Sequence, residues 1–168
     1  MKVIQYNLIT ADGFIARNDG SEDFFPDEIF NEYFELCNKY GNTIMGRKTY
    51  EMLQSWGIEE ENFTNTVKLV VSKNNLGVAE GYICISSPQE ALNFLQEKGF
   101  ETALLCSGSV LTSVFLKENL IDELLLTIFP LMIGTGKTLF TENFTKDLIL
   151  QNVSTKDNLL KCHYIYQK

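Results

Sequence analysis

The sequence predicts an α/β fold in which a central, mostly parallel sheet carries helices on both faces. In the middle of the chain, short runs rich in β-branched and aromatic residues alternate with longer stretches whose apolar residues recur three and four positions apart. The last third contains strand-like runs without long helices between them, which predicts an antiparallel C-terminal hairpin. The 168 residues, 45% of them hydrophobic, suit one domain, which we expect to span residues 1–168.

The first predicted strand, residues 2–9, has the sequence KVIQYNLI. Asp-Gly pairs at 12–13 and 19–20 predict turns on either side of a short FIA strand. A helix is expected to start near Pro26, because proline suits a first helical turn, and to end at Gly41. Its predicted apolar face consists of Ile29, Phe30, Tyr33, Phe34 and Cys37.

Strands and helices alternate through the middle of the chain. The predicted strands are residues 42–45, 67–72, 82–86 and 103–106, and the predicted helices are residues 48–53, 88–98 and 110–118. Ser87 and Pro88 favour the start of the second helix, and Gly99 favours its end. Because such strands are parallel, we expect their carboxyl ends to lie along one edge of the sheet.

The C-terminal third is predicted to be antiparallel. Its strands are expected at residues 122–129, 148–155 and 159–166. The sequence Lys-Asp-Asn at 156–158 is typical of a hairpin turn between the last two strands.

The composition excludes several classes of function. A net charge of −8 opposes a nucleic-acid surface, so any anion site must be local. No stretch is apolar enough for a signal peptide or a membrane helix, and the single His and four scattered Cys predict no metal site. We expect a cytoplasmic protein with reduced thiols. Residues 19–35 are rich in Asp and Glu and contain no Lys or Arg, so this stretch should repel anions.

Three predicted strands are followed by residues that suit phosphate groups. The first turn is Gly46-Arg47-Lys48-Thr49, the second is Ser72-Lys73, and the third is Ser107-Gly108-Ser109. Free amides at a helix N-terminus attract anions, glycine permits close approach, and arginine can donate two parallel hydrogen bonds. Each turn alone is also compatible with ordinary capping. Together they predict a dinucleotide site, and Arg47, with Lys48, Ser72 or Lys73, is the expected partner of the 2′-phosphate of NADPH.

Two other nucleotide motifs are rejected. The sequence GTGKT at 134–138 lacks the glycine that a phosphate-binding loop needs five positions before Gly136, where Leu131 stands. No G-x-G-x-x-G follows a predicted strand. Asp12 is open to two interpretations, as a turn residue that binds its own backbone or as a polar group beside the nicotinamide.

The order of the motifs resembles the dihydrofolate reductase-like superfamily, and within it the C-terminal reductase domain of the riboflavin-biosynthesis enzyme RibD. The matching segments are TADGFIA at 10–16, IMGRKTYE at 44–51, Ser107-Gly108-Ser109 with Leu111 and Phe115, and NLIDELLLTIFPLMIGTGKTLF at 119–140. Together they cover essentially the whole chain. The resemblance implies a dihydrofolate reductase-like fold, NADPH as cofactor and a homodimer, for which the final strands are the candidate interface.

The resemblance also implies roles for individual residues. The cofactor would contact Ala11, Gly46, Arg47, Lys48, Thr49, Ser72, Lys73, Ser107, Gly108, Ser109, Val110 and Leu111, and Asp12 is the candidate catalytic residue. The substrate pocket would include Asp27, Phe30, Phe34, Trp56, Cys106 and Thr127. In dihydrofolate reductases a carboxylate on the first helix binds the pterin, and that place falls near Phe30 here. In riboflavin reductases the helix is basic and a Glu stands two places before the third-turn glycine, where this chain has Cys106.

The resemblance therefore implies an NADPH-dependent reductase that transfers a hydride to a small heterocyclic substrate, of the 5-amino-6-(5-phosphoribosylamino)uracil reductase type. Because the first helix is acidic, we expect a substrate that is neutral or cationic on that side. Two alternatives stay open at this point: a dihydrofolate reductase, and a nucleotide-binding protein without catalysis.

Overall fold

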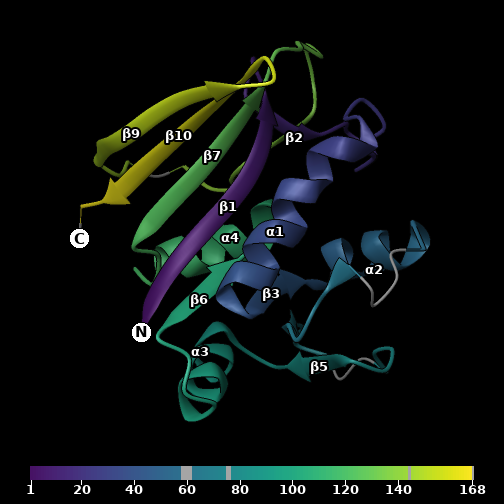
Figure 1. Ribbon diagram of the computed structural model, residues 1–168, viewed down its shortest axis with the longest axis vertical. Helices are drawn as coiled ribbons and strands as arrows, with labels where there is room; N and C mark the ends of the chain where they lie inside the picture. Colours follow the sequence, from purple (N-terminus) through teal and green to yellow (C-terminus); the bar gives the residue numbers. More distant parts are fainter. Residues whose placement is uncertain (58–61, 75–76, 144, 168) are drawn as a thin grey trace.

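The computed structural model describes residues 1–57, 62–74, 77–143 and 145–167, except for the side chain of Asp27. Eight strands form the main sheet (Figure 1). In spatial order they are β5 (Tyr82–Ile85), β4 (Val67–Val71), β3 (Asn42–Gly46), β6 (Thr102–Leu105), β1 (Lys2–Thr10), β7 (Glu123–Phe129), β10 (Leu159–Tyr166) and β9 (Leu148–Lys156). A second small sheet pairs β2 (Phe14–Ala16) with β8 (Lys137–Thr138). The helices are η1 (Asp27–Phe30), α1 (Asn31–Tyr40), α2 (Arg47–Ser55), α3 (Pro88–Glu97) and α4 (Ser109–Lys117).

The predicted mixture of parallel and antiparallel strands is confirmed. The strands from β5 to β7 run parallel to one another, whereas β10 is antiparallel to both β7 and β9. The turn between β9 and β10 places Asp157 and Asn158 at φ 51° and 64°. Two successive positive φ values are typical of the tight hairpin turn that matches strand twist.

The two faces of the sheet bury separate apolar clusters, and Figure 1 shows α1 in front of the sheet and α4 behind it. On one face, Tyr33 and Cys37 of α1 and Leu53 of α2 pack on alternate residues of β1, such as Ile4. On the other face, α3 and α4 cover a cluster that includes Phe115, which is fully buried. The prediction of helices on both faces is therefore confirmed.

The predicted first helix is divided in two. After Pro26 the chain forms the 3₁₀ turn η1, and α1 begins only at Asn31. Gly41 ends α1 with φ 68°, in the left-handed conformation that glycine adopts without steric cost. The α-helical geometry begins at Asn31, and Glu32, in the first turn of α1, contacts Tyr6 of β1.

The strand β8 was not predicted, because two residues are too few for a hydrophobic pattern. It forms the end of the segment GTGKT at 134–138, which is not a phosphate-binding loop, and it pairs with β2. A Cβ atom added at Gly136 would clash with the carbonyl oxygen of Ala16. This segment therefore packs backbone against backbone, and Gly136 is needed there for lack of space.

The edge strand β9 is exposed along its whole length. Its apolar side chains include Leu150, which is 55% exposed, and Val153, which is 51% exposed. An exposed edge strand with apolar side chains is a site at which another chain can pair. No helix within the described residues is both long enough and apolar enough to cross a membrane.

Candidate functional site

The three turns predicted to bind phosphate lie at one edge of the sheet. They follow β3, β4 and β6, and β3 is the parallel neighbour of the other two. Gly46 pairs with Val71, so the second turn, which begins at Ser72, leaves the sheet beside the first. The amide of Cys106 donates to the carbonyl of Ile44, which places the third turn on the other side of the first.

The first and third turns contact each other directly. The amide of Gly108 donates to the hydroxyl of Thr49 over 3.3 Å. A Cβ atom at Gly46 would lie 3.6 Å from the Cβ of Leu111. The N-termini of α2 and α4 therefore lie side by side, at Gly46 and Gly108, and neither residue can supply a side-chain cap. The amides of both first helical turns are left for water or an anion.

The predicted basic residues border this rim. Arg47 begins α2 and lies 3.7 Å from Glu51, in an exposed ion pair one turn apart. Lys48 and Lys73 are exposed, and the amide of Ser72 donates to Ile85 rather than remaining free. Because an exposed pair of this kind is weak, the guanidinium of Arg47 can exchange Glu51 for a phosphate at little cost.

The remaining predicted cofactor residues lie in different surroundings. Ser107 is buried, and its hydroxyl lies 2.9 Å from that of Thr112, so this hydroxyl faces the protein interior. Ser109 is partly exposed and begins α4, whereas the apolar side chain of Val110 is 66% exposed. The amide of Ala11 donates to the carbonyl of Leu131, so the backbone of the turn after β1 is held to the loop after β7.

A chain of buried hydrogen bonds holds the third turn in place. Tyr166 donates its hydroxyl hydrogen to Gln5, the amide nitrogen of Gln5 donates to Asn7, and Asn7 donates to the backbone carbonyl of Ser107. These distances are 3.1, 2.8 and 3.1 Å, respectively. A fully satisfied buried chain of this kind rigidifies its members. It therefore fixes the peptide group that joins Ser107 to Gly108.

A cleft opens beside the rim, with a cavity volume of about 110 Å³. Of the predicted substrate residues, Phe30, Trp56 and Cys106 line it. Ring centroids of Phe30 and Trp56 lie 4.9 Å apart, which closes one side with aromatic surface. The other lining residues are Tyr6, Asn7, Leu8, Ile15, Glu22, Ile29, Tyr33, Thr49, Met52, Leu53, Ser107 and Gly108. The cleft thus combines apolar walls with the polar rim, as ligand sites commonly do.

Other residues predicted for the substrate pocket lie elsewhere. Phe34 packs in the aromatic core, 5.3 Å from the ring of Phe63. Thr127 is only 2% exposed and donates its hydroxyl hydrogen to Glu32 on α1. Neither residue lines the cleft, and the side chain of Asp27 lies outside the described part of the chain. Phe34 lies outside the cleft lining because its ring packs against Tyr33 and Phe63.

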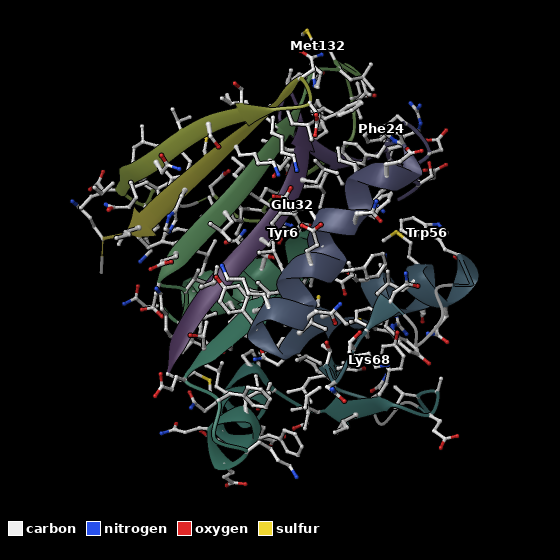
Figure 2. All side chains as sticks on the ribbon, in the orientation of Figure 1. Tyr6, Phe24, Glu32, Trp56, Lys68 and Met132 are labelled. Atoms are coloured by element: carbon white, nitrogen blue, oxygen red, sulfur yellow. The ribbon has the colours of Figure 1, made fainter. Side chains whose placement is uncertain are left out.

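Glu32 is a carboxylate of α1 that the sequence analysis missed. It lies next to Tyr6 between β1 and α1 (Figure 2). Its two oxygens accept hydrogen bonds from Lys161 at 2.6 Å, Thr127 at 3.0 Å and Tyr6 at 3.2 Å. Lys161 of β10, which is distant in sequence, thus provides a positive charge to the acidic stretch. Burial, together with the nearby Glu32, raises the pKa of Tyr6 well above its ordinary value.

Glu22 is the second carboxylate that the sequence analysis missed. It lies in the loop between β2 and η1 and lines the cleft. Removal of water by its surroundings raises the pKa of this carboxyl from 4.5 to about 7. Its position within an acidic run gave no signal, because the apolar residues around it come from other elements. Perturbed carboxyls in clefts are candidates for catalytic groups.

Asp12 connects two loops. Its carboxylate accepts hydrogen bonds from the hydroxyl of Thr10 at 2.6 Å and from the amides of Ile133 and Gly134 at 3.0 and 2.7 Å. These bonds lower the pKa of Asp12, with the largest contribution from Thr10. The carboxylate therefore stays ionised and is a poor proton donor at neutral pH. Asp12 thus binds the backbone of the loop after β7 in addition to Thr10 of its own turn, and a role beside the nicotinamide stays a prediction.

Metal-binding side chains do not gather here. Within the described ranges, no group of three or more His, Cys, Asp or Glu could hold a metal ion. Cys106 is buried, and burial raises the pKa of its thiol well above the ordinary value. The thiol therefore stays protonated at neutral pH and serves as part of the cleft wall.

Comparison with known proteins identifies relatives along the full length of the chain. The sequence profile of the RibD C-terminal domain family matches residues 1–161. The uncharacterized protein YwjB of Bacillus subtilis is 28% identical, in an alignment that covers 98% of this chain and 97% of that protein.

Solved structures also resemble the chain over nearly its full length. A putative riboflavin biosynthesis protein from Shewanella sp. PV-4 superposes with a TM-score of 0.83, with 25% identity and complete coverage of both chains. Dihydrofolate reductase from Enterococcus faecalis, in complex with NADP(H) and RAB-propyl, has a TM-score of 0.72 with 18% identity. That alignment covers 99% of this chain and 97% of the reductase, and it shows a shared fold.

Proposed function

Because the chain belongs to the RibD C-terminal domain family, we propose that it is an NADPH-dependent reductase of a small heterocyclic substrate. The observation that carries this proposal is the pair of helix N-termini at Gly46 and Gly108, side by side and without side-chain caps, at the border of an apolar cleft. Two sets of unpaired amides suit the successive phosphates of a dinucleotide. The adjacent Arg47 and Lys73 suit a further phosphate.

The rim residues have distinct roles in this proposal. The amides of α2 and α4 would bind the phosphates, and Arg47 would contact the 2′-phosphate that distinguishes NADPH from NADH. Thr49 and Asn7 would hold the third turn in place beside the first, because Thr49 is hydrogen-bonded to Gly108 and Asn7 to Ser107. When bound, NADPH supplies a hydride, and the apolar walls of the cleft would exclude water from the reacting groups.

The cleft suggests a class of substrate. Its volume of about 110 Å³ is below the range of about 300 Å³ and above that is usual for drug-sized ligands, so it suits a single flat ring. Phe30 and Trp56 offer aromatic surface against which a heterocycle can stack. Within the family resemblance, we propose a substrate of the 5-amino-6-(5-phosphoribosylamino)uracil type, of which only the pyrimidine ring would occupy this cleft, with any phosphate directed away from η1 and α1.

The two alternatives predict different chemistry. A dihydrofolate reductase would need a carboxylate on α1 that is available to the pterin, but Glu32 is bound by Lys161, Thr127 and Tyr6 and does not line the cleft. A binding protein without catalysis would hold NADPH and oxidise none of the acceptors. A spectrophotometric screen of NADPH oxidation with 5-amino-6-(5-phosphoribosylamino)uracil, its dephosphorylated form and dihydrofolate distinguishes these functions.

The cofactor assignment is tested by Arg47→Ala. Loss of a charged hydrogen bond costs about 1.5–3 kcal/mol, so NADPH binding should weaken about 10- to 150-fold while NADH binding changes much less. Lys98→Ala is the matched control, because this cation follows α3 at the opposite edge of the sheet. Binding is measured by calorimetry. Equal weakening of both nucleotides by Arg47→Ala would remove the 2′-phosphate assignment, and absence of binding to the unmodified protein would refute the function.

We also propose that the homodimer expected from the resemblance forms through β9. The strand is nine residues long, lies at the edge of the sheet and exposes apolar side chains on both of its faces. Pairing with a second copy would satisfy its free backbone groups and cover these side chains.

A further inference from the structure

We propose that Glu22 is the proton donor of the reaction, a catalytic role that rests on the proposed reductase function. Reduction of a C=N or C=O bond requires a hydride at carbon and a proton at nitrogen or oxygen. The carboxyl group of Glu22 would donate the proton, and the hydride would come from NADPH when it is bound. Water then returns a proton to the Glu22 carboxylate, which completes the balance of the cycle.

The position of Glu22 is the first argument. The loop between β2 and η1 brings Glu22 into the lining of the cleft, together with Thr49 and Gly108. This cleft is where the cofactor rim meets the substrate walls. Glu22 therefore reaches the space in which the reacting bond must lie, whereas Asp12 is occupied by the backbone of the loop after β7.

The absence of competing acids is the second argument. Among the described residues that line the cleft, Glu22 is the only one with a carboxyl group. The other titratable groups in the lining are Tyr6, Tyr33 and Cys106. Burial raises the pKa of all three well above their ordinary values, so they hold their protons too tightly to donate them at neutral pH.

The freedom of the carboxyl group is the third argument. In the described part of the protein, the Glu22 side chain has neither a hydrogen bond nor an ion pair, whereas its charged neighbours in the loop are engaged. Arg17 binds Asp23 at 2.6 Å, and Asp19 accepts two hydrogen bonds from Ser21. On the helix packed against the cleft, Glu32 is held by Lys161. Within the described residues, no opposite charge thus stabilises the ionised form of Glu22, and desolvation alone sets the direction of its pKa shift.

These conditions suit a general acid. Desolvation raises the pKa of Glu22 to about 7, so that about half of the molecules carry the proton at neutral pH. An acid whose pKa lies near the working pH combines availability of the proton with a favourable tendency to release it. An exposed glutamate, ionised at pH 7, could not do this.

The test combines a titration of the protein with kinetics. In protein without cofactor, ¹³C NMR of labelled glutamate carboxyl carbons should show one group that titrates near pH 7 and that is missing from Glu22→Gln. Glu28→Gln removes an exposed carboxyl of η1, outside the cleft, and is the matched control. It should leave this signal unchanged.

The kinetic part uses the three acceptors of the screen above. For the unmodified protein and Glu28→Gln, kcat/KM for NADPH should decrease as the pH rises above about 7, because this ratio depends on the pKa of Glu22 in the protein without ligand, and kcat should decrease at a somewhat higher pH. Glu22→Gln should lower kcat by about 10²- to 10⁴-fold, abolish this pH dependence and leave NADPH affinity within about twofold, because removal of a general acid affects only the proton transfer. Glu22→Asp should retain the pH dependence with intermediate kcat.

The outcomes separate the two proposals. If the unmodified protein oxidises NADPH and Glu22→Gln does so equally well, Glu22 is not the donor while the reductase function stands. A Glu22 signal that titrates near pH 4.5 would also reject the role of Glu22. If the unmodified protein turns over none of the acceptors, the reductase function and the role of Glu22 are rejected together.

Discussion

The raised pKa of Glu22 has a consequence for stability that can be measured without substrate. A carboxyl with a pKa of 4.5 in the unfolded chain and about 7 in the folded protein is harder to ionise in the folded state. This difference corresponds to a destabilisation of about 3 kcal/mol, at about 1.4 kcal/mol per pH unit. The destabilisation is absent below pH 4.5, develops as the pH rises and is complete above about pH 7.

The substitution Glu22→Gln removes the ionisation and with it this pH dependence. Between pH 5.5 and 8, the free energy of unfolding of the variant relative to the unmodified protein should increase by about 2 kcal/mol, since part of the effect lies below pH 5.5. Urea denaturation followed by circular dichroism at both pH values measures this difference. A pH of 5.5 is above the sequence pI of 4.7, where a net charge keeps the protein in solution.

Glu28→Gln is again the control, and its stability difference should be the same at both pH values within about 0.5 kcal/mol, which is usual for exposed positions. The reasoning is refuted if the difference for Glu22→Gln is also independent of pH. The carboxyl would then ionise as easily in the folded protein as in the unfolded chain. The general-acid role would lose its physical basis as well.

Two further predictions concern the fold and its assembly. Gly136→Ala should destabilise the protein by about 1–3 kcal/mol in the same denaturation assay, because its Cβ would meet the carbonyl of Ala16, whereas Gly77→Ala, with open space around its Cβ, should cost nothing. Leu150→Lys in β9 should convert a dimer to a monomer in sedimentation experiments, whereas Met132→Lys, at an exposed position outside β9, should not. A monomeric unmodified protein would contradict the dimer.

Most of the fold could be predicted from the sequence because it depends on local patterns. Alternating apolar residues, Gly41 after α1 and the Asp157-Asn158 turn each act within a few residues of their own position. The common rim followed from the parallel order of the strands. Among the described elements, β8 was missed: it is held by pairing with β2 and by the packing of Gly136, and a two-residue strand leaves no periodicity in the sequence.

The polar part of the site was harder to predict because it is assembled from distant segments. Counting back along the chain placed the carboxylate of the first helix near Phe30, but the 3₁₀ turn before α1 makes Glu32 the residue that faces β1 and β10. Its partner Lys161 is 129 positions away. Glu22 likewise looks like one more acid in a charged run. Its altered pKa depends on apolar groups from β1, η1 and α2, which only the folded chain brings together.

The same arrangement explains how an acidic protein can offer a site to an anionic cofactor. The net charge of −8 would repel phosphates if it were spread evenly, but the rim relies on helix N-termini, whose partial positive charge comes from the backbone. The carboxylate of α1 is neutralised by Lys161, and Glu22 loses much of its charge near pH 7. Phosphates at the rim would favour the protonated form of Glu22 further, since a nearby negative charge raises the pKa of a carboxyl group. Cofactor binding and the supply of the proton would thus support each other.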